Sequence, residues 1–462
     1  MSVHVDTSIA PNLDRAPLVS GGTFVWGHAA EMGRDPLGLL VRASAEAGPI
    51  ARLRFGPVET LSLTDPAAIE RVLVGNASAY GKSTRSYRLI QLLLGDGLVT
   101  SQGEHWLRQR RIAQPAFLRK RIAALGERMV TASVDLTRAW AGPATRGETI
   151  DVHAEMNHLA LRIAGETLFS TDVTGEAAAI GDALKVGMAE IDRLIMAPLP
   201  APQYWPSLGN LRFWRSARTL RRVTDDLIGA RRAEGGDHDD LLGLLMAARD
   251  PETGEGMSDQ QLRDETLTML LAGHETTANG LTWSLHLLGL HPAIRRRLQA
   301  ELDAVLGDRA PTPDDHRALP YTRQVVQEAL RLYPPVWIVE RMAEADDVLG
   351  GYRVKKGTMV LMSQWAVHRS PRLWTNPEAF DPDRFGPDRP APGRFAYFPF
   401  SRGQRQCIGD RFAELEMVLV LATLLQRYTL DPVPGAAPAL APQITLRPVD
   451  GLRMTLRPRA AD

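Results

Sequence analysis

The chain contains very little cysteine. A single one, Cys407, occurs in 462 residues. A lone thiol cannot form an intramolecular disulfide, so Cys407 is either an inert buried side chain or a chemically used one. Such sparing use of cysteine fits a reducing compartment, and we expect a cytoplasmic protein.

Net charge and long apolar runs are also absent. Lys and Arg together number 54, as do Asp and Glu, which argues against binding to nucleic acid through phosphate contacts. Residues 1–22 lack a basic segment followed by an apolar core, so they predict neither a signal peptide nor an anchor. The apolar run from Met417 to Leu425 is far shorter than the roughly 20 residues that cross a bilayer. We therefore expect a soluble protein without a membrane anchor.

Helical patterns dominate what is present. With 44% hydrophobic residues the chain can bury a large core. Residues 123–248 predict successive amphipathic helices, and residues 258–290 predict the longest one. Ser258 and Gln261 have the spacing of a capping box at its start. In contrast, residues 83–102 have poor periodicity and predict a long irregular loop.

Strand signals are short. Residues 51–55 and 59–63 flank the turn-forming Gly56-Pro57 and predict two strands. Hairpins are expected over residues 349–362 and over residues 443–456, the second with a tip near Ile444 and Thr445. The chain is thus mainly helical, with small β-sheets.

The cysteine lies in the segment Phe400-Ser401-Arg402-Gly403-Gln404-Arg405-Gln406-Cys407-Ile408-Gly409. Arg402, Arg405 and a helical pattern that starts at Asp410 predict a lowered thiol pKa. Glycines on both sides of the sulfur permit a sharp turn or a close approach. Such a thiolate suits iron, although an inert buried cysteine explains the thiol alone about equally well.

Two further patterns place polar groups on helices. Trp106 and Arg110 are four residues apart, so an indole N–H and a guanidinium can face the same anion; the alternative is a solvated basic face. The segment Ala272-Gly273-His274-Glu275-Thr276-Thr277 lies in the longest predicted helix. Its mid-helix glycine costs roughly 1 kcal/mol, which points to a functional reason for it. The alternative for the two threonines is hydroxyls that bond back to carbonyls one turn earlier.

Charged pairs occur in the last third of the chain. Glu328 and Arg331 are three residues apart, a spacing that usually gives an exposed pair of small energy. The apolar segment Val336–Val339 is followed by Glu340 and Arg341, and Arg384 comes later. The ordinary interpretation of that segment is a buried strand with one charged end.

Together these motifs resemble those of the cytochromes P450. Phe-x-x-Gly-x-Arg-x-Cys-x-Gly matches the family's haem-binding loop at every fixed position, and Ala-Gly-x-Glu-Thr-Thr and Glu-x-x-Arg lie in the order that the family requires. The resemblance covers essentially the whole chain. It implies one helix-rich domain over residues 1–462 around a buried haem, with residues 1–22 as a flexible tail and no fused reductase.

The resemblance also implies a site. Cys407 would ligate the iron of haem b (iron protoporphyrin IX), Thr276 would hydrogen-bond dioxygen, and Glu275 would relay protons from solvent. His274 would point away into packing. Many short bacterial members have His where this chain has Trp106. The remaining cofactor-binding positions are Trp106, Arg110, Arg341 and Arg405 for the propionates, and Ala272, Gly273, Phe400 and Gly409. Glu328, Arg331 and Arg384 would form a buried network that holds the cysteine loop.

The activity implied is a monooxygenase that hydroxylates or epoxidises a lipophilic substrate: a terpenoid, steroid, fatty acid or polyketide. Electrons would come from NAD(P)H through a reductase and a ferredoxin or flavodoxin, and the enzyme would be a monomer. Residues 83–102 would cover the substrate, and residues 194–205 are the candidate lid. The apolar pocket candidates are Leu93, Leu94, Ile195, Trp337, Ile338 and Ile444. A basic cluster would attract an acidic donor; it comprises Arg108, Arg111, Arg119, Lys120 and Arg121.

Two alternatives stay open at this point. One is a haem-thiolate peroxygenase or isomerase that does not use dioxygen, against which the Glu275-Thr276 pair argues. The other is a haem- or ligand-binding protein without turnover.

Overall fold

The structure is a computed structural model that describes residues 14–168, 170, 174–197, 205, 207–235, 240–435 and 437–459, without the side chains of 174–179 and 196. It divides into two compact units. The sheet unit comprises Met1–Tyr87, Trp337–Ala379 and Pro392–Gln406; the helical unit comprises Arg88–Val336, Phe380–Ala391 and Cys407–Asp462. Each unit is described separately.

The sheet unit is built on a five-stranded sheet, in the order β1-β2-β8-β5-β3. The strands are β1 (Ile50–Phe55), β2 (Val58–Leu63), β3 (Tyr80–Gly81), β5 (Val339–Ala343) and β8 (Met359–Met362). Only β2 and β8 run parallel within this sheet, with Leu61 opposite Val360, while β1 and β2 form the antiparallel pair that the sequence predicts. Helices α1 (Ala29–Arg34), α2 (Pro36–Ala47), α3 (Pro66–Glu70) and α14 (Gln364–Val367) belong to this unit, with π-helix η1 (Arg71–Gly75) and 3₁₀-helix η2 (Ala77–Ala79).

The expected hairpin over residues 349–362 is wrong. The hairpin is shorter and joins β6 (Asp347–Leu349) to β7 (Tyr352–Val354), whereas β8 pairs with β2 and β5. Gly350 and Gly351 have φ of 54° and 86°, a conformation that two successive glycines adopt at little cost. They therefore close the turn earlier than the expected one.

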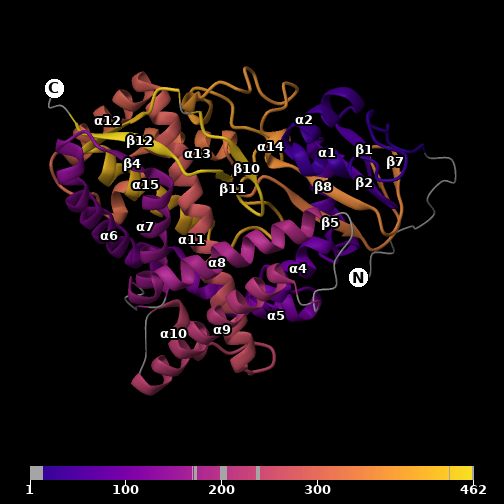
Figure 1. Ribbon diagram of the computed structural model, residues 1–462, viewed down its shortest axis with the longest axis horizontal. Coiled ribbons are helices and arrows are strands. Elements are labelled where there is room, and N and C mark those ends of the chain that lie inside the picture. Colours follow the sequence, from indigo (N-terminus) through magenta and orange to yellow (C-terminus); the bar gives the residue numbers. More distant parts are fainter. Residues whose placement is uncertain are drawn as a thin grey trace. The chain divides into compact units, whose positions relative to one another are not determined.

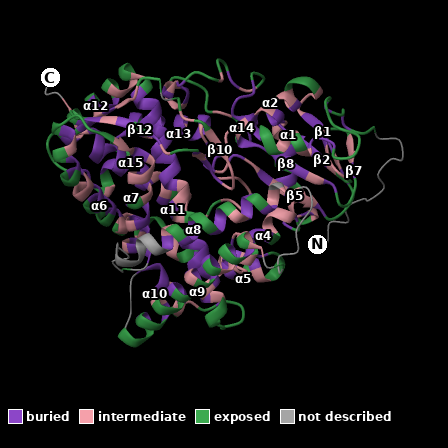
Figure 2. Ribbon diagram, viewed as in Figure 1, coloured by how far each residue is buried: buried purple, intermediate pink, exposed green. Residues whose placement is uncertain are grey.

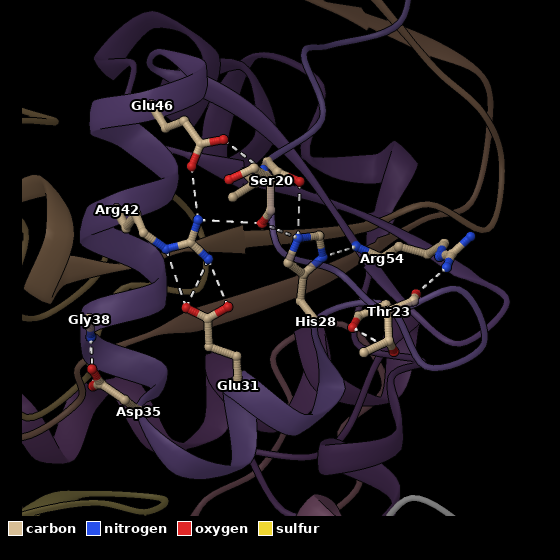
Figure 3. Close-up of polar contacts among 11 residues, drawn as sticks. Ser20, Thr23, His28, Glu31, Asp35, Gly38, Arg42, Glu46 and Arg54 are labelled. Atoms are coloured by element: carbon tan, nitrogen blue, oxygen red, sulfur yellow. Dashed lines mark hydrogen bonds and ion pairs between the residues drawn. The ribbon is translucent and has the colours of Figure 1, made fainter.

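Residues 14–28 run beside β1. Val19 N–H donates to the Arg52 carbonyl (3.0 Å). The ring of His28 donates from Nε2 to the Val19 carbonyl (3.1 Å) and accepts at Nδ1 from Arg54 N–H (3.2 Å), which fixes its tautomer (Figure 3). Figure 3 also shows the Arg42 guanidinium donating to Glu31 and Glu46, at 2.7 and 2.8 Å. These contacts join the entry segment to α1, α2 and β1.

The helical unit is labelled in Figure 1. Its helices are α4 (Arg85–Leu94, from Arg88 on), α5 (Gly103–Ala113), η3 (Gln114–Phe117), α6 (Arg119–Thr145), α7 (Val152–Leu168), α8 (Thr174–Met196), α9 (Leu208–Glu234), α10 (Leu241–Ala247), α11 (Asp259–Leu290), α12 (Pro292–Leu306), η4 (Pro313–Arg317), α13 (Pro320–Leu332), η5 (Pro382–Phe385) and α15 (Asp410–Leu425). Its strands are β4 (Thr149–Asp151), β9 (Tyr428–Pro432), β10 (Leu440–Pro442), β11 (Leu446–Pro448) and β12 (Arg453–Pro458).

Helix α11 forms the centre of the helical unit. It packs against α7, α9, α13 and α15, and most of its length is buried (Figure 2). The run from Leu281 to Leu288 is buried throughout, and its hydroxyls, those of Thr282 and Ser284, donate to carbonyls four residues earlier in the helix. The predicted capping box is confirmed, because Ser258 and Gln261 bond each other's backbone N–H groups.

Two predictions for the helical unit are wrong. Residues 85–94, expected to be irregular, form α4, in which Leu89 and Leu93 lie one turn apart on its buried face. The C-terminal hairpin joins β10 to β11 around residues 443–445, while β12 pairs with β9 and β4. The strand within 452–456 was placed correctly, but its partners are distant in the sequence and the local pattern does not reveal them. Among the helices that the structure describes, none has the length and apolarity needed to cross a bilayer.

Candidate active site

Cys407 directly precedes α15 and carries a free, solvent-accessible thiol. The surrounding protein nevertheless desolvates the sulfur, and this burial raises the pKa of Cys407 to about 11. A hydrogen bond from the Gly409 backbone and the charge of Arg110 lower the pKa, whereas the carboxylate of Asp410 raises it. The prediction of a lowered thiol pKa is therefore wrong for the free thiol. Metal coordination deprotonates a thiol outright, so the thiol can still act as a ligand.

The two arginines on which that prediction rested have other partners. Arg402 donates to the carbonyls of Arg394 (3.3 Å) and Tyr397 (3.2 Å). Arg405 acts on Lys82, whose pKa it lowers. The cation that acts on the sulfur is instead Arg110, which lies far away in the sequence.

Helix α5 positions Arg110. Trp106 is buried on this helix, and Arg110 is half-buried. Burial lowers the pKa of Arg110, while Cys407 and Asp410 counteract that shift. His105 faces the preceding loop, with Nε2 3.2 Å from the Asp96 carbonyl oxygen. From this helix the charge of Arg110 acts on the thiol.

Three cations gather in the sheet unit. Arg341 on β5 donates to the Glu340 carbonyl at 2.8 Å. Lys82 is buried, and burial lowers its pKa far below the usual value, with further lowering by the charges of Arg341 and Arg405. The Lys82 ammonium also lies 4.8 Å from the centroid of the Tyr87 ring. Like charges buried together are unfavourable unless an anion joins them, so this cluster fits a carboxylate-bearing ligand.

Lys82 was missed in the sequence. It follows the short strand β3 in a polar stretch, and no spacing links it to Arg341 or Arg405. Only the fold shows that the three charges interact.

Thr276 lies on a partly exposed stretch of α11. Its hydroxyl donates to the Ala272 carbonyl at 2.6 Å, so the back-bonded alternative describes this side chain correctly. Because its only proton is used there, the oxygen retains lone pairs that can accept a hydrogen bond. A Cβ at Gly273 would meet only a Leu168 methyl at 3.7 Å, an ordinary contact. Protein packing therefore does not require this glycine, whereas close approach by a bound group explains it.

The two residues between Gly273 and Thr276, His274 and Glu275, differ in their surroundings. Glu275 accepts from the Thr445 hydroxyl (2.8 Å), and burial raises its pKa against the lowering effects of Thr445 and Arg447. His274 is buried, and desolvation lowers its pKa to about 4, so it stays neutral. It packs inward as expected.

The structure also brings Glu328, Arg331 and Arg384 together. Arg331 donates to both carboxylate oxygens of Glu328, at 2.7 and 2.8 Å, and Arg384 donates to Glu328 at 3.2 Å. The backbone N–H of Asp381 adds a bond of 2.9 Å. Glu328 and Arg331 are wholly buried, so each charge depends on the other.

The pocket candidates are dispersed over several elements. Leu93 and Leu94 are buried in α4, and Leu93 lies so close to α8 that a Cβ at Gly187 would be 3.0 Å from its methyl groups. Ile195 and Ile444 are half-buried in the helical unit. In the sheet unit, Trp337 is buried, Ile338 is half-buried, and Phe400 of the cysteine loop is also half-buried. Most of the candidate lid, residues 198–204, lies outside the described residues.

A mainly helical unit with one thiol in the field of an arginine, and an acid next to an alcohol on its central helix, is typical of a haem-thiolate oxygenase. The chain matches the family model for Cytochrome P450 over residues 17–450. It is 40% identical to cyclooctat-9-en-7-ol 5-monooxygenase and 39% identical to cyclooctatin synthase, both of Streptomyces melanosporofaciens. These alignments cover 90% of this chain and 89% of the first relative, and 96% of this chain and of the second. Pentalenene oxygenase of Streptomyces avermitilis is 36% identical, over 90% of this chain and 91% of that protein.

The chain therefore belongs to the cytochrome P450 family. It is a haem-dependent monooxygenase that transfers one atom of dioxygen to a lipophilic substrate.

Proposed function

We propose that the substrate is a polycyclic terpenoid, which the enzyme hydroxylates or epoxidises. The observation that carries this proposal is the set of relatives, which are named for cyclooctatenol, cyclooctatin and pentalenene and align over nearly the whole chain. The apolar candidates on α4, α8 and the β10–β11 turn support it, because they offer few polar groups to a substrate.

Cys407 is the proposed iron ligand. When bound, the haem supplies dioxygen activation, which the electron density of a thiolate ligand favours. Arg110, whose charge acts on the sulfur, would bond a haem propionate together with the indole of Trp106. We assign the same role to Lys82, Arg341 and Arg405, and a propionate would offset the repulsion that the two arginines exert on Lys82.

Glu275 and Thr276 control protons. Burial raises the pKa of Glu275, so its carboxyl holds a proton more readily than an exposed glutamate does and can deliver the proton that the reaction consumes. The Thr276 hydroxyl is fixed by its bond to the Ala272 carbonyl and offers an acceptor toward the reacting centre. In this scheme Glu275 supplies the proton, and Thr276 orients the group that receives it.

Separate proteins supply the electrons. We propose NAD(P)H, a reductase and an acidic ferredoxin. Arg108 and Arg111 of the basic cluster are already paired with Asp250, at 3.5 and 3.2 Å, so they contribute less to a docking surface. A cavity of about 370 Å³ is a better candidate for the docking surface of the electron donor. Its ionisable lining residues are Arg119, Arg317, Arg323, Arg411 and His316, with Asp314 and Glu414.

The proposal also includes a cytoplasmic location, where a lone thiol remains reduced.

The test is a screen of polycyclic terpene hydrocarbons for a shift of the haem spin state. Compounds that bind are then incubated with a surrogate reductase, ferredoxin, NADPH and isotopically labelled dioxygen. We expect product that carries one labelled oxygen atom. A spin shift with steroids or fatty acids alone would overturn the terpenoid assignment. Spin shifts without product would indicate a binding protein, and labelled product formed only with peroxide would indicate a peroxygenase.

A further inference from the structure

The β10–β11 hairpin lies along one face of α11. Glu275, Asn279 and Trp283 are four residues apart on this helix and each bonds the hairpin. The Thr445 hydroxyl donates to Glu275 (2.8 Å), Asn279 Nδ2 donates to Thr445 Oγ1 (3.2 Å), and Trp283 Nε1 donates to the Leu446 carbonyl (3.0 Å). Helix α11 thus holds the hairpin through three side chains, and Glu275 is the first of them along the helix.

Helix α8 bonds the same turn. The backbone N–H of Ile444 donates to Asp192 Oδ1 at 3.0 Å, and the Asp192 side chain is buried. Ile444 and Thr445 are adjacent, so two carboxylates from different helices bond neighbouring residues of the turn. A shift of Ile444 would move the hydroxyl that bonds Glu275.

The two carboxylates also interact electrostatically. Burial raises the pKa of Asp192 to about 7, and the charge of Glu275 contributes to this increase. Arg447 on β11 lowers the pKa of both carboxylates, so they compete for one cation. From α7, His153 lies in the fields of Arg447 and Lys185, but burial lowers its pKa to about 4 and it adds no charge. Ionising both acids is therefore costly.

Asn279 permits two hydrogen-bond patterns. It is wholly buried, and its Oδ1 has no partner in the described part of the chain. When Glu275 is ionised, Asn279 Nδ2 donates to Thr445 Oγ1 and the Thr445 hydroxyl donates to the carboxylate. A half-turn of the amide lets Oδ1 accept from Thr445, whose oxygen then accepts from a protonated Glu275. Asn279 and Thr445 can therefore form this chain of hydrogen bonds with Glu275 whether Glu275 is ionised or protonated.

We propose that Asp192 is a positioning residue for Glu275: from α8 it holds, through the Ile444 backbone, the turn that presents the Thr445 hydroxyl to the Glu275 carboxylate. The proposal rests on the proposed role of Glu275 in proton delivery. Asp192 itself touches neither substrate nor haem in this scheme.

The test separates the hydrogen bond of Asp192 from its charge. Asp192→Asn retains an acceptor for Ile444 and removes the charge, whereas Asp192→Ala removes both. Glu190→Gln on the same helix is the matched control, because its partner is Arg193, at 2.7 Å. The first measurement is hydrogen exchange of the Ile444 amide in substrate-free holoenzyme. We expect about tenfold faster exchange in Asp192→Ala and less than about threefold in the other two variants.

The second measurement is the titration of Glu275 itself, read from the carboxyl infrared band that Glu275→Gln lacks. The Thr445 hydrogen bond lowers the pKa of Glu275, so loosening the turn in Asp192→Ala should shift this titration to higher pH by about 0.5 units or more, whereas Asp192→Asn and Glu190→Gln should leave it unchanged. The pH at which product formed per NADPH begins to fall should shift in the same direction. Unchanged Ile444 exchange or an unchanged Glu275 titration in Asp192→Ala would overturn the proposal. The exchange and infrared measurements need no turnover, so their failure is distinct from failure to form a terpenoid product.

Discussion

The threonine hydroxyls of α11 differ in whether their oxygens are accessible to a ligand. Thr276 and Thr282 donate to the carbonyls four residues earlier, at 2.6 and 2.7 Å. Their local geometry is the same, but Thr282 is buried and Thr276 is partly exposed. Only Thr276 can therefore offer its remaining lone pairs to a ligand.

Replacing Thr276 by Ala should separate substrate binding from coupling. The acceptor is lost, so protons reach the reacting centre without direction, while the apolar contacts with substrate remain. We expect product formed per NADPH to fall at least about tenfold and peroxide to rise, with an unchanged spin shift. Thr282→Ala is the control and should keep its coupling. Equal coupling in both variants would exclude a role for Thr276.

Replacing Lys82 by Met should have opposite effects on the two forms of the protein. Without haem, the variant loses a desolvated charge that Arg341 and Arg405 repel, so its melting temperature should rise. With haem, one charge-assisted hydrogen bond is lost, and haem release should be about tenfold faster. Haem transfer to apomyoglobin measures the release rate, and Lys355→Met at an exposed site is the control. Faster release without apo-stabilisation would contradict the proposed repulsion.

Among the elements, α13 provides a comparison between buried and surface ion pairs. Arg331→Ala leaves Glu328 buried with only Arg384 to neutralise it, at a cost of roughly 3–5 kcal/mol. Arg323→Ala on the same helix breaks a surface pair with Glu414 (3.3 Å), which is worth about 0–1 kcal/mol. We expect little haem-bound protein from the first variant and normal yield from the second, measured by haem absorbance per protein. Full haem occupancy in Arg331→Ala would refute the role of the network.

The loop before α5 is held to α11 by a second pair of acids. Glu265 accepts from Leu98 N–H (3.1 Å), and Asp264 accepts from Asp96 N–H (2.9 Å). Burial raises the pKa of Glu265 to about 8. The folded protein therefore keeps a proton that the unfolded chain releases above about pH 4.5, and stability declines as pH rises from there to about 8.

Glu265→Gln should weaken this pH dependence. Gln keeps an acceptor for Leu98 and cannot ionise, so the variant should match the parent near pH 5 and melt a few degrees higher near pH 9, a gain of roughly 2 kcal/mol. Thermal melting across this range measures the difference, with the exposed Glu104→Gln as the control. Parallel melting curves at all pH values would show that Glu265 does not titrate in this window.

The elements and side chains differ in how far the sequence predicts them. The capping box at Ser258 and the contact of Glu328 with Arg331 depend on residues three apart, so local spacing carries the information. Strand partners of β8 and β12 lie far away in the sequence, and both hairpin predictions failed for that reason. Burial is likewise nonlocal, which is why the thiol pKa was predicted in the wrong direction.

For the molecule as a whole, the net charge is zero, so attraction of a charged partner depends on how the charges are distributed over the surface. Arg119, Arg317 and Arg411 line the cavity beside α15 and have no ion-pair partner among the described residues, whereas Arg323 is paired with Glu414. This local excess of positive charge near the helix that follows Cys407 would attract an acidic electron donor.

Reversing two of these charges should slow electron delivery without affecting the haem. With Arg119→Glu and Arg411→Glu combined, we expect reduction by an acidic ferredoxin to fall at least about tenfold at low salt and to lose most of its salt dependence, since exposed charges are screened beyond about 10 Å at 0.1 M salt. Stopped-flow reduction across a salt titration measures both effects. Arg215→Glu on the exposed face of α9 carries the same type of change and should leave the rate within about twofold. Because a dithionite-reduced sample bypasses docking, its carbon monoxide spectrum should be the same in all variants; a salt-independent reduction rate in the unaltered enzyme would exclude electrostatic docking at this cavity.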